Sequence, residues 1–151
     1  MVADLNQQRV LKFLDAFYSG DAAAATACCD EELDSITYAP IELFPHLGHK
    51  HGNAWVAEAI KTQQKRYSNR KYEIKFIAVD GDNIATMQFI SLRKRNDDRV
   101  VHLEAAEFFT LRANRILVHR SFFDSFDFVQ QLLGRDLTES FATSVRDAMK
   151  R

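Results

Sequence analysis

A chain of 151 residues with 46% hydrophobic and 27% charged residues has the composition of one ordinary globular domain, and its two prolines and five glycines exclude a fibrous or disordered protein. Twenty basic residues balance twenty-one acidic ones, so the formal charge of -1 gives no field that would gather nucleic acid or an anionic membrane. We therefore expect neither nucleic acid nor a membrane as a partner.

The first half of the chain predicts three helices. Apolar residues at helical spacing indicate a helix over residues 4–19, and Asp21 can cap a short Ala-rich helix that runs to about residue 29. Residues 33–38 have the pattern of a strand that Pro40 halts, and a loop rich in Pro, Gly and His follows. A third helix is expected over residues 52–67.

The second half changes to the period of strands. Strands are expected at residues 72–79, 84–93, 100–112 and 115–124. The turns between them are short, which implies antiparallel neighbours. Because the middle strands carry bulky residues on both parities, helices should cover one face and a partner subunit the other. A short helix over residues 125–133 and an amphipathic helix after a capping-box pattern at residues 136–139 should end the chain.

The two cysteines and the start of the chain give an expectation about the compartment. Cys28 and Cys29 are adjacent, which disfavours a bridge between them and leaves no partner for a disulfide framework, so we expect half-buried core thiols. The first residues show no basic segment followed by an apolar stretch, and no run approaches the roughly 18 apolar residues of a membrane span. We expect a cytoplasmic protein.

Several short motifs, taken in order and spacing, carry a family likeness. They are Phe13-Leu14-Asp15-Ala16-Phe17-Tyr18-Ser19-Gly20-Asp21, Gly48-His49-Lys50-His51-Gly52, Gly81-Asp82-Asn83-Ile84-Ala85, Arg115-Ile116, Phe122-Phe123-Asp124 and Gln130-Gln131-Leu132-Leu133. Together they resemble the end of the first helix, the loop before the third helix and the final strands of ketosteroid isomerases and SnoaL-like polyketide cyclases, within the nuclear transport factor two superfamily.

This resemblance implies an α+β, cone-shaped (cystatin-like) fold, in which three N-terminal helices pack on a curved, mixed but mainly antiparallel sheet that encloses a pocket. Residues 1–135 would form the domain and residues 136–151 its C-terminal helical extension. The implied function is that of a cofactor-free isomerase, cyclase or hydrolase acting on a small hydrophobic molecule of carbonyl or cyclic type. The alternatives are a non-catalytic protein of the same fold that binds a small ligand, and an assembly module.

The standard steroid isomerase reaction is disfavoured, because its catalytic groups are missing at the matching positions. The resemblance places the tyrosine donor of those enzymes at Phe13 and their protonated aspartate at Ala106, and neither residue here has a donor. The aspartate base should fall between Thr37 and Ala39, where no carboxylate stands.

The same resemblance sets which residues should face the pocket. The expected inward residues of the sheet are Met87, Phe89, Ser91, His102, Glu104, Phe108, His119, Ser121 and Phe123. The substrate is expected to contact Phe13, Phe17, Phe44, Trp55, Phe89, His102, Phe108, Ser121 and Phe123. Apolar walls with a few convergent polar groups are what a small-molecule cavity requires. Trp55 would be a lid over the ligand or, equally, a packing residue of the third helix.

His119 is the first candidate for proton transfer, because imidazole titrates near neutral pH, and Glu104 or Asp124 would orient it. The alternative is a hydrogen-bonded core histidine, with the carboxylates capping backbone groups or pairing with Arg120. Tyr38 or Ser121 would bind the substrate oxygen.

Glu42, His46, His49 and His51 lie in the loop that we expect at the mouth of the pocket. Glu42 could add a base there. The three histidines suggest a metal, but their spacing matches no familiar site, and we expect a solvated lid or rim with no metal or cofactor.

Homodimerisation is expected from the sheet. The side of the strand that carries Leu103, Ala105, Phe109 and Leu111 would otherwise expose a sizeable apolar patch. Besides this second copy, the expected partner is a small hydrophobic molecule.

Overall fold

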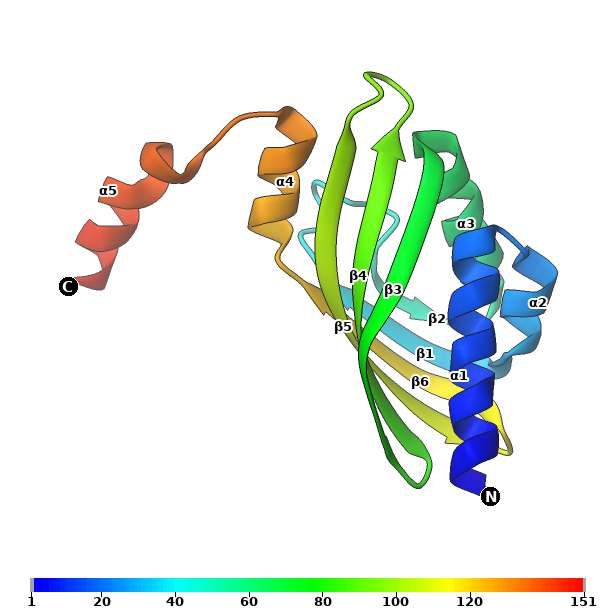
Figure 1. Cartoon of the computed structure of the whole chain (residues 1–151). Coiled ribbons are helices and arrows are strands. Elements are labelled where there is room, and N and C mark those ends of the chain that lie inside the picture. Colours follow the sequence, from blue (N-terminus) through cyan, green and yellow to red (C-terminus); the bar gives the residue numbers. More distant parts are fainter. Residues whose placement is uncertain (1, 151) are drawn as a thin grey trace.

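The computed structural model describes residues 2–150 as helices packed against one bent sheet (Figure 1). The strands are β1 (Cys29–Tyr38), β2 (Gly48–His51), β3 (Tyr67–Asp80), β4 (Asn83–Lys94), β5 (Val100–Arg112) and β6 (Arg115–Phe123). The helices are α1 (Val2–Ser19), α2 (Ala22–Ala27), α3 (Ala54–Arg66), α4 (Ser125–Leu133) and α5 (Thr138–Met149). The sheet is open and six-stranded, with the order β2-β1-β6-β5-β4-β3. The predicted α+β class and its mixed, mainly antiparallel sheet are confirmed.

The helix ends follow from local chemistry. The Asp21 carboxylate accepts the Ala24 N–H and so caps α2, as predicted. Asp124 caps α4 in the same way by accepting the Asp127 N–H, and α4 ends where Gly134 takes a left-handed conformation at φ 70°. The predicted capping box before α5 does not form, because the carboxylate of Asp136 accepts the N–H of Thr138 in a local turn and the N-cap position has no side-chain bond.

Three strands differ from the prediction by more than one residue, and the first of them, β1, begins at Cys29 rather than at residue 33. Residues 48–51, expected as loop, form the edge strand β2, which pairs antiparallel with β1 and sets His49 opposite Ile36. The sequence Gly-His-Lys-His has no apolar alternation, so main-chain pairing rather than side-chain burial creates this strand. β3 begins at Tyr67, directly after α3, whereas the pattern predicted a start at residue 72.

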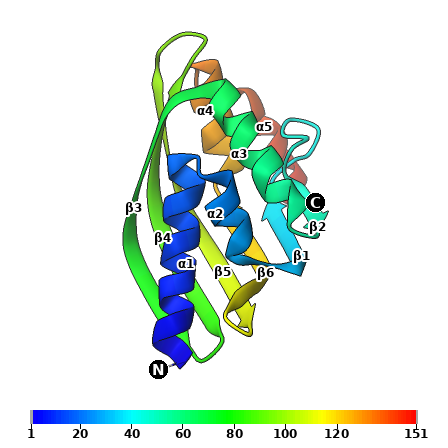
Figure 2. The ribbon, with the colours of Figure 1, turned by 90° about the vertical axis from the view of Figure 1, so that its right-hand side faces the viewer.

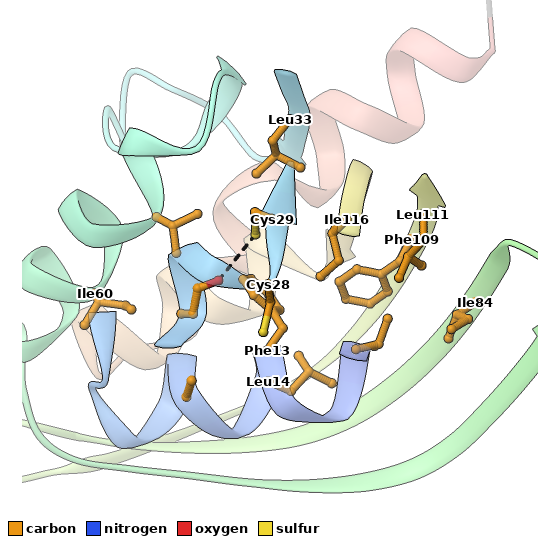
Figure 3. Close-up of a cluster of buried hydrophobic side chains, with 14 residues drawn as sticks. Phe13, Leu14, Cys28, Cys29, Leu33, Ile60, Ile84, Phe109, Leu111 and Ile116 are labelled. Carbon is orange, nitrogen blue, oxygen red and sulfur yellow. Dashed lines mark hydrogen bonds between the residues drawn. The ribbon is translucent and has the colours of Figure 1, made fainter. Parts of the chain in front are cut away.

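The first three helices lie together on one face of the sheet (Figure 2). The main core forms between α1, α2 and the strands, and Figure 3 shows Phe13, Leu14, Phe109 and Ile116 within it. Cys29 is fully rather than half buried, and its thiol donates to the Ala25 carbonyl at 3.5 Å. Burial, together with the neighbouring thiol, raises the pKa of Cys29 to about 12, which makes it an unreactive core residue.

The predicted facing of β4 and β5 is wrong. Their inner residues are Ile84, Thr86, Gln88, Ile90 and Leu92 on β4, and Val101, Ala105, Glu107, Phe109 and Leu111 on β5. Met87, Phe89, Ser91, His102, Glu104 and Phe108 have the opposite parity and lie on the outer face. A one-residue difference in parity transfers every side chain to the other face. On β6 the prediction holds, with His119 and Ser121 buried and Phe123 half-buried.

The apolar side of β5 from which a dimer was predicted does not lie on the outer face. Ala105, Phe109 and Leu111 are buried in the interior and Leu103 is half-buried, so they form no outer patch. The outer face instead exposes Tyr38, Met87, Phe108 and Phe122, each by between 38% and 48%. The rings of Tyr38 and Phe122 stack with centroids 4.4 Å apart, and Phe108 meets Phe122 edge-on at 5.9 Å.

The two C-terminal helices are held differently. α4 inserts Phe128 into a second apolar cluster with Phe44, Ile90 and Leu92. α5 extends away from the sheet (Figure 1) and has no buried residue. Its Phe141 ring lies 6.1 Å from that of Phe126 on α4. Among residues 2–150, no helix is long and apolar enough to cross a membrane.

Candidate functional site

A cavity of about 120 Å³ lies between the helices and the inner face of the sheet. Its walls come from α1, α3, α4, the segment before β2, and strands β1 and β3 to β6. The aromatic residues on its surface are Phe13, Phe17, Tyr18, Phe44, Trp55, Tyr67, Phe123 and Phe128. Polar groups are few, and two of them, Glu107 and His119, are buried titratable side chains.

These two side chains belong to a chain of hydrogen bonds across four neighbouring strands. Ser35 Oγ on β1 lies 2.8 Å from His119 Nδ1 on β6, and His119 Nε2 lies 2.7 Å from Glu107 Oε1 on β5. Gln88 on β4 donates its amide N–H to Glu107 Oε2, and Thr86 Oγ1 donates to Gln88 Oε1 at 2.7 Å. The strand order explains the chain, since Ser35 pairs with His119 and Thr86 with Glu107 in the register of the sheet.

The hydrogen bonds of the network are consistent with one role for each member. With Glu107 as a carboxylate, Oε2 accepts from the Gln88 amide and Oε1 accepts from the Nε2–H of the His119 tautomer that carries its proton there. His119 Nδ1 is then the acceptor of the Ser35 hydroxyl. Because a carboxylate has about four acceptor positions, two remain on Glu107 for a group in the cavity. Glu107 is 8% exposed and His119 5%, so the pair operates away from bulk water.

Tyr18 adds a hydroxyl to the cavity wall. Burial raises the pKa of the Tyr18 hydroxyl, and the Glu107 charge raises it further, so the group stays protonated and able to donate. Its ring stacks on that of Tyr72 with centroids 4.9 Å apart, which fixes its direction.

Two nitrogen atoms of residues that line the cavity are buried without a hydrogen-bond partner in the part of the chain that is described. They are Nε1 of Trp55 and Nδ1 of His46. The Trp55 ring lies parallel to the His119 ring, with centroids 6.4 Å apart and an angle of 18°. Burial, with the charges of Arg66 and Lys50, lowers the pKa of His46 to about 4, so this imidazole is neutral at physiological pH.

The cavity brings together most of the residues predicted from the sequence. Phe13, Phe17, Phe44, Trp55, His119, Ser121 and Phe123 line it. Phe89, His102, Glu104 and Phe108 do not, because their strands present them outward. On that outer face His102 stacks on Phe89 at 5.4 Å and lies 2.9 Å from the Ser91 hydroxyl.

The other predicted polar residues lie outside the cavity. Asp124 is occupied as the cap of α4, and Tyr38 is exposed on the outer face. Glu42 is exposed in the segment after β1.

The three histidines considered for a metal do not meet. His49 Nε2 lies 2.5 Å from an Asp34 oxygen, and His51 is 3.6 Å from Glu32. His46 instead packs against the Phe44 ring. Residues 2–150 contain no cluster of three or more side chains arranged to hold a metal ion.

Sequence reasoning missed Glu107, Gln88, Ser35 and Tyr18. A signal for Glu107 was present, because it shares the parity of Val101, Ala105, Phe109 and Leu111 and is the charged residue of that apolar set. An acidic residue at an interior position needs a partner, which is His119.

Comparisons with known proteins identify the family and agree with the fold. A model of the SnoaL-like domain matches residues 10–119. A solved structure of a proposed isomerase from Rhodopseudomonas palustris is 25% identical, with a TM-score of 0.76 over 84% of this chain and 97% of the other. An epoxide hydrolase from M. tuberculosis, described as LEH-like, is 20% identical, with a TM-score of 0.70 over 93% and 98% of the chains.

A third similar structure, a proposed SnoaL-like polyketide cyclase from Jannaschia sp. CCS1, is 13% identical, with a TM-score of 0.73 over 85% of this chain and 92% of the other. Likeness at 20% identity or less concerns the fold alone. No curated protein sequence matches the chain.

Proposed function

This chain belongs to the SnoaL-like domain family, and from that premise we propose that it is a cofactor-free enzyme that moves a proton on a small hydrophobic carbonyl or cyclic compound. Neighbouring structures carry the names of an isomerase, an epoxide hydrolase and a polyketide cyclase, reactions that share a step in which a base removes a proton from carbon or water. The single observation that carries the proposal is the buried Glu107–His119 pair on the wall of an aromatic cavity.

Glu107 is the proton acceptor in this proposal. Both ring nitrogens of His119 are engaged, Nε2 with Glu107 and Nδ1 with Ser35, so the imidazole has no lone pair left for the substrate. The carboxylate keeps acceptor positions free. This assignment replaces the sequence-based hypothesis that His119 acts directly and that Glu104 orients it, since Glu104 lies on the outer face.

In the proposed reaction Glu107 both takes up the proton and returns it. Glu107 takes a proton from the carbon next to a carbonyl, and the electron pair moves to the carbonyl oxygen to give an enolate; the same carboxylic acid returns the proton to the ring. For an epoxide, Glu107 takes a proton from water while the water oxygen attacks a ring carbon. The C–O bond of that carbon breaks, its electron pair goes to the epoxide oxygen, and this alkoxide takes the proton back from Glu107 to give the diol. His119 and Gln88 hold the carboxylate in place in both cases. Tyr18 of α1 and Ser121 of β6 line the same cavity, and their hydroxyls would be the donors to the substrate oxygen.

One observation favours a second candidate, a binding protein without chemistry. The hydrogen bonds of Ser35, His119, Glu107, Gln88 and Thr86 form a complete network within the protein. Such a network also serves to satisfy polar groups in a core and to fix the shape of a cavity. In this case the cavity would take up the same class of ligand and release it unchanged.

The two candidates separate in a test of proton exchange and ring opening. We expect the protein to exchange the protons next to the carbonyl of α-tetralone in deuterium oxide, or to open cyclohexene oxide to the diol, as followed by NMR. Glu107→Gln should lower the active rate by about 100-fold or more, because it removes a general base. Glu104→Gln, on the outer face of the same strand, is the matched control and should keep the wild-type rate.

Two results would contradict the enzyme proposal. One is equal rates for wild type and Glu107→Gln, and the other is the absence of both reactions above the rate in buffer. The second result, together with binding of α-tetralone, would favour the binding protein.

A further inference from the structure

We propose that Trp55 and His46 form a polar subsite for the oxygen atoms of a flat, oxygen-bearing ring compound, with the Trp55 indole N–H donating to a ring carbonyl beside Glu107. The inference rests on the proposed function for the class of ligand, but it concerns binding and is tested apart from turnover. Neither residue takes part in the hydrogen-bond network of Glu107 and His119.

The indole of Trp55 is the clearest indicator. An indole N–H is a donor and never an acceptor, and buried donors in folded proteins almost always have a partner. Here Nε1 has lost contact with solvent and has no acceptor among residues 2–150, although Trp55 lines the cavity. A ligand oxygen that accepts this hydrogen bond would complete the site.

The position of Trp55 links the subsite to the proton acceptor. Its ring lies parallel to the imidazole of His119 at 6.4 Å, and His119 holds Glu107 at 2.7 Å. A carbonyl bonded to the indole would therefore lie in the same cavity as the carboxylate, between α3 and the sheet. This is the arrangement that a ketone needs if the carbon next to its carbonyl is to meet Glu107.

His46 supplies a second, different contact. Its imidazole is neutral, so it offers one N–H and one lone pair, and Nδ1 is buried with no partner in the described chain. It lies against Phe44, whose ring also contacts Phe123 and Phe128. The two unpartnered nitrogens therefore have different neighbours: the indole of Trp55 lies by His119, and the imidazole of His46 lies by the Phe44 ring. A ring with two oxygen functions fits this pair of contacts better than a pure hydrocarbon does.

The aromatic walls favour a flat ring. Phe13, Phe44, Phe123, Phe128 and Trp55 present apolar surface to the cavity, and flat rings stack or pack edge-on against such side chains. An aliphatic chain would gain the same burial without these contacts and would leave both nitrogens unpaired.

The chain has a single tryptophan, so its indole N–H gives one side-chain resonance that reports on this site alone. We expect α-tetralone to shift this proton resonance strongly downfield, as a new hydrogen bond does. Tetralin, which has the same rings and lacks the oxygen, should bind by its apolar surface and leave the proton near its free position. Equal shifts with both compounds would overturn the inference, and so would the absence of any shift with α-tetralone, because an ordered water would then be the partner of the indole.

Substitution gives an independent measurement by calorimetry. Trp55→Phe should lower the affinity for α-tetralone by about tenfold and the affinity for tetralin much less, because the substitution removes a hydrogen bond and keeps an aromatic ring. Equal losses for the two compounds would reduce Trp55 to a packing residue. The NMR result on the wild-type protein stands if this variant fails to fold.

Failure of the proposed function gives a different pattern. If Glu107 is no base, no exchange occurs, and yet α-tetralone still shifts the indole proton. If the subsite is wrong, turnover can persist while the indole proton stays unmoved.

Discussion

At the scale of single residues, the site is defined by how each polar group is paired. Glu107 sits in the interior because His119 and Gln88 bond to both of its oxygens. His46 is half-buried and its Nδ1 has no such partner in the described chain, and burial, with the charges of Arg66 and Lys50, lowers its pKa to about 4. The paired Glu107 and His119 and the unpaired His46 and Trp55 thus line one cavity. Of the unpaired residues, we expect His46 to respond to pH and Trp55 to respond to ligand.

The pKa of His46 predicts an acid-sensitive stability. Its pKa is lower in the folded chain than the 6.5 of a free histidine, so between about pH 6.5 and pH 4 the unfolded chain binds a proton that the folded chain does not. The contribution is complete above pH 6.5 and is lost as the pH falls through this window. It amounts to at most about 3 kcal/mol, because one pKa unit corresponds to about 1.4 kcal/mol.

Urea unfolding at about pH 7 and about pH 5 measures this effect. His46→Gln should lose less stability over that interval than the wild type, whereas His51→Gln, whose imidazole is exposed, should behave like the wild type. The same pH dependence in His46→Gln and in the wild type would show that His46 does not set it.

At the scale of elements, α4 and α5 have similar apolar patterns and different roles. Phe128 of α4 is 6% exposed and packs in the second apolar cluster, whereas Phe141 of α5 is 52% exposed. Phe128→Ala should lower the free energy of unfolding by about 3–5 kcal/mol, as large-to-small changes in a core do. Phe141→Ala should change it by less than about 1 kcal/mol.

Chemical denaturation of the two variants tests this contrast. A large loss from Phe141→Ala in a dilute sample would mean that α5 is covered in solution, by a second copy or by the body of the chain. Equal, small losses from both variants would mean that Phe128 does not pack in the second apolar cluster.

The sequence predicted these elements better than their facing. Helical spacing in α1, the Asp21 cap and the polar turns between strands are local signals, and each is confirmed. The facing of β5 depends on which of two apolar parities meets the helices, and Phe108 on one parity is as bulky as Phe109 on the other. The family likeness favoured Phe108 as an inward residue. Glu107 has the parity of Ala105 and Phe109, and an inward position for its charge makes sense only once His119 is known to lie beside it on the next strand.

At the scale of the whole molecule, the fold was predictable because the order of helices and turns constrains it, while the site was predictable only in part. The aromatic walls at Phe13 and Trp55 lie on predicted helices, whereas Phe44 lies in the segment between β1 and β2 and follows from the family likeness alone. The pairing of Glu107 with His119 depends on the register between β5 and β6, which no local pattern reports.

The outer face of the sheet carries the last prediction, which concerns assembly. Tyr38, Met87, Phe108 and Phe122 are exposed there, with stacked or edge-on rings among three of them. We propose that a second copy covers this face, since a sheet face can pair with the same face of another copy about a two-fold axis. Light scattering should then give twice the mass of the chain at micromolar concentration.

Phe108→Glu provides the direct test of the outer face. Two copies of the variant would bring like charges together on an apolar surface, so it should shift the protein to monomer while leaving its fold intact. Glu139→Gln on exposed α5 is the matched control and should leave the mass unchanged. A wild-type monomer in dilute solution would refute the dimer outright. A dimer that Phe108→Glu leaves intact would place the contact elsewhere, and the exposed apolar side of α5, with Val145 and Met149, would be the surface to change next.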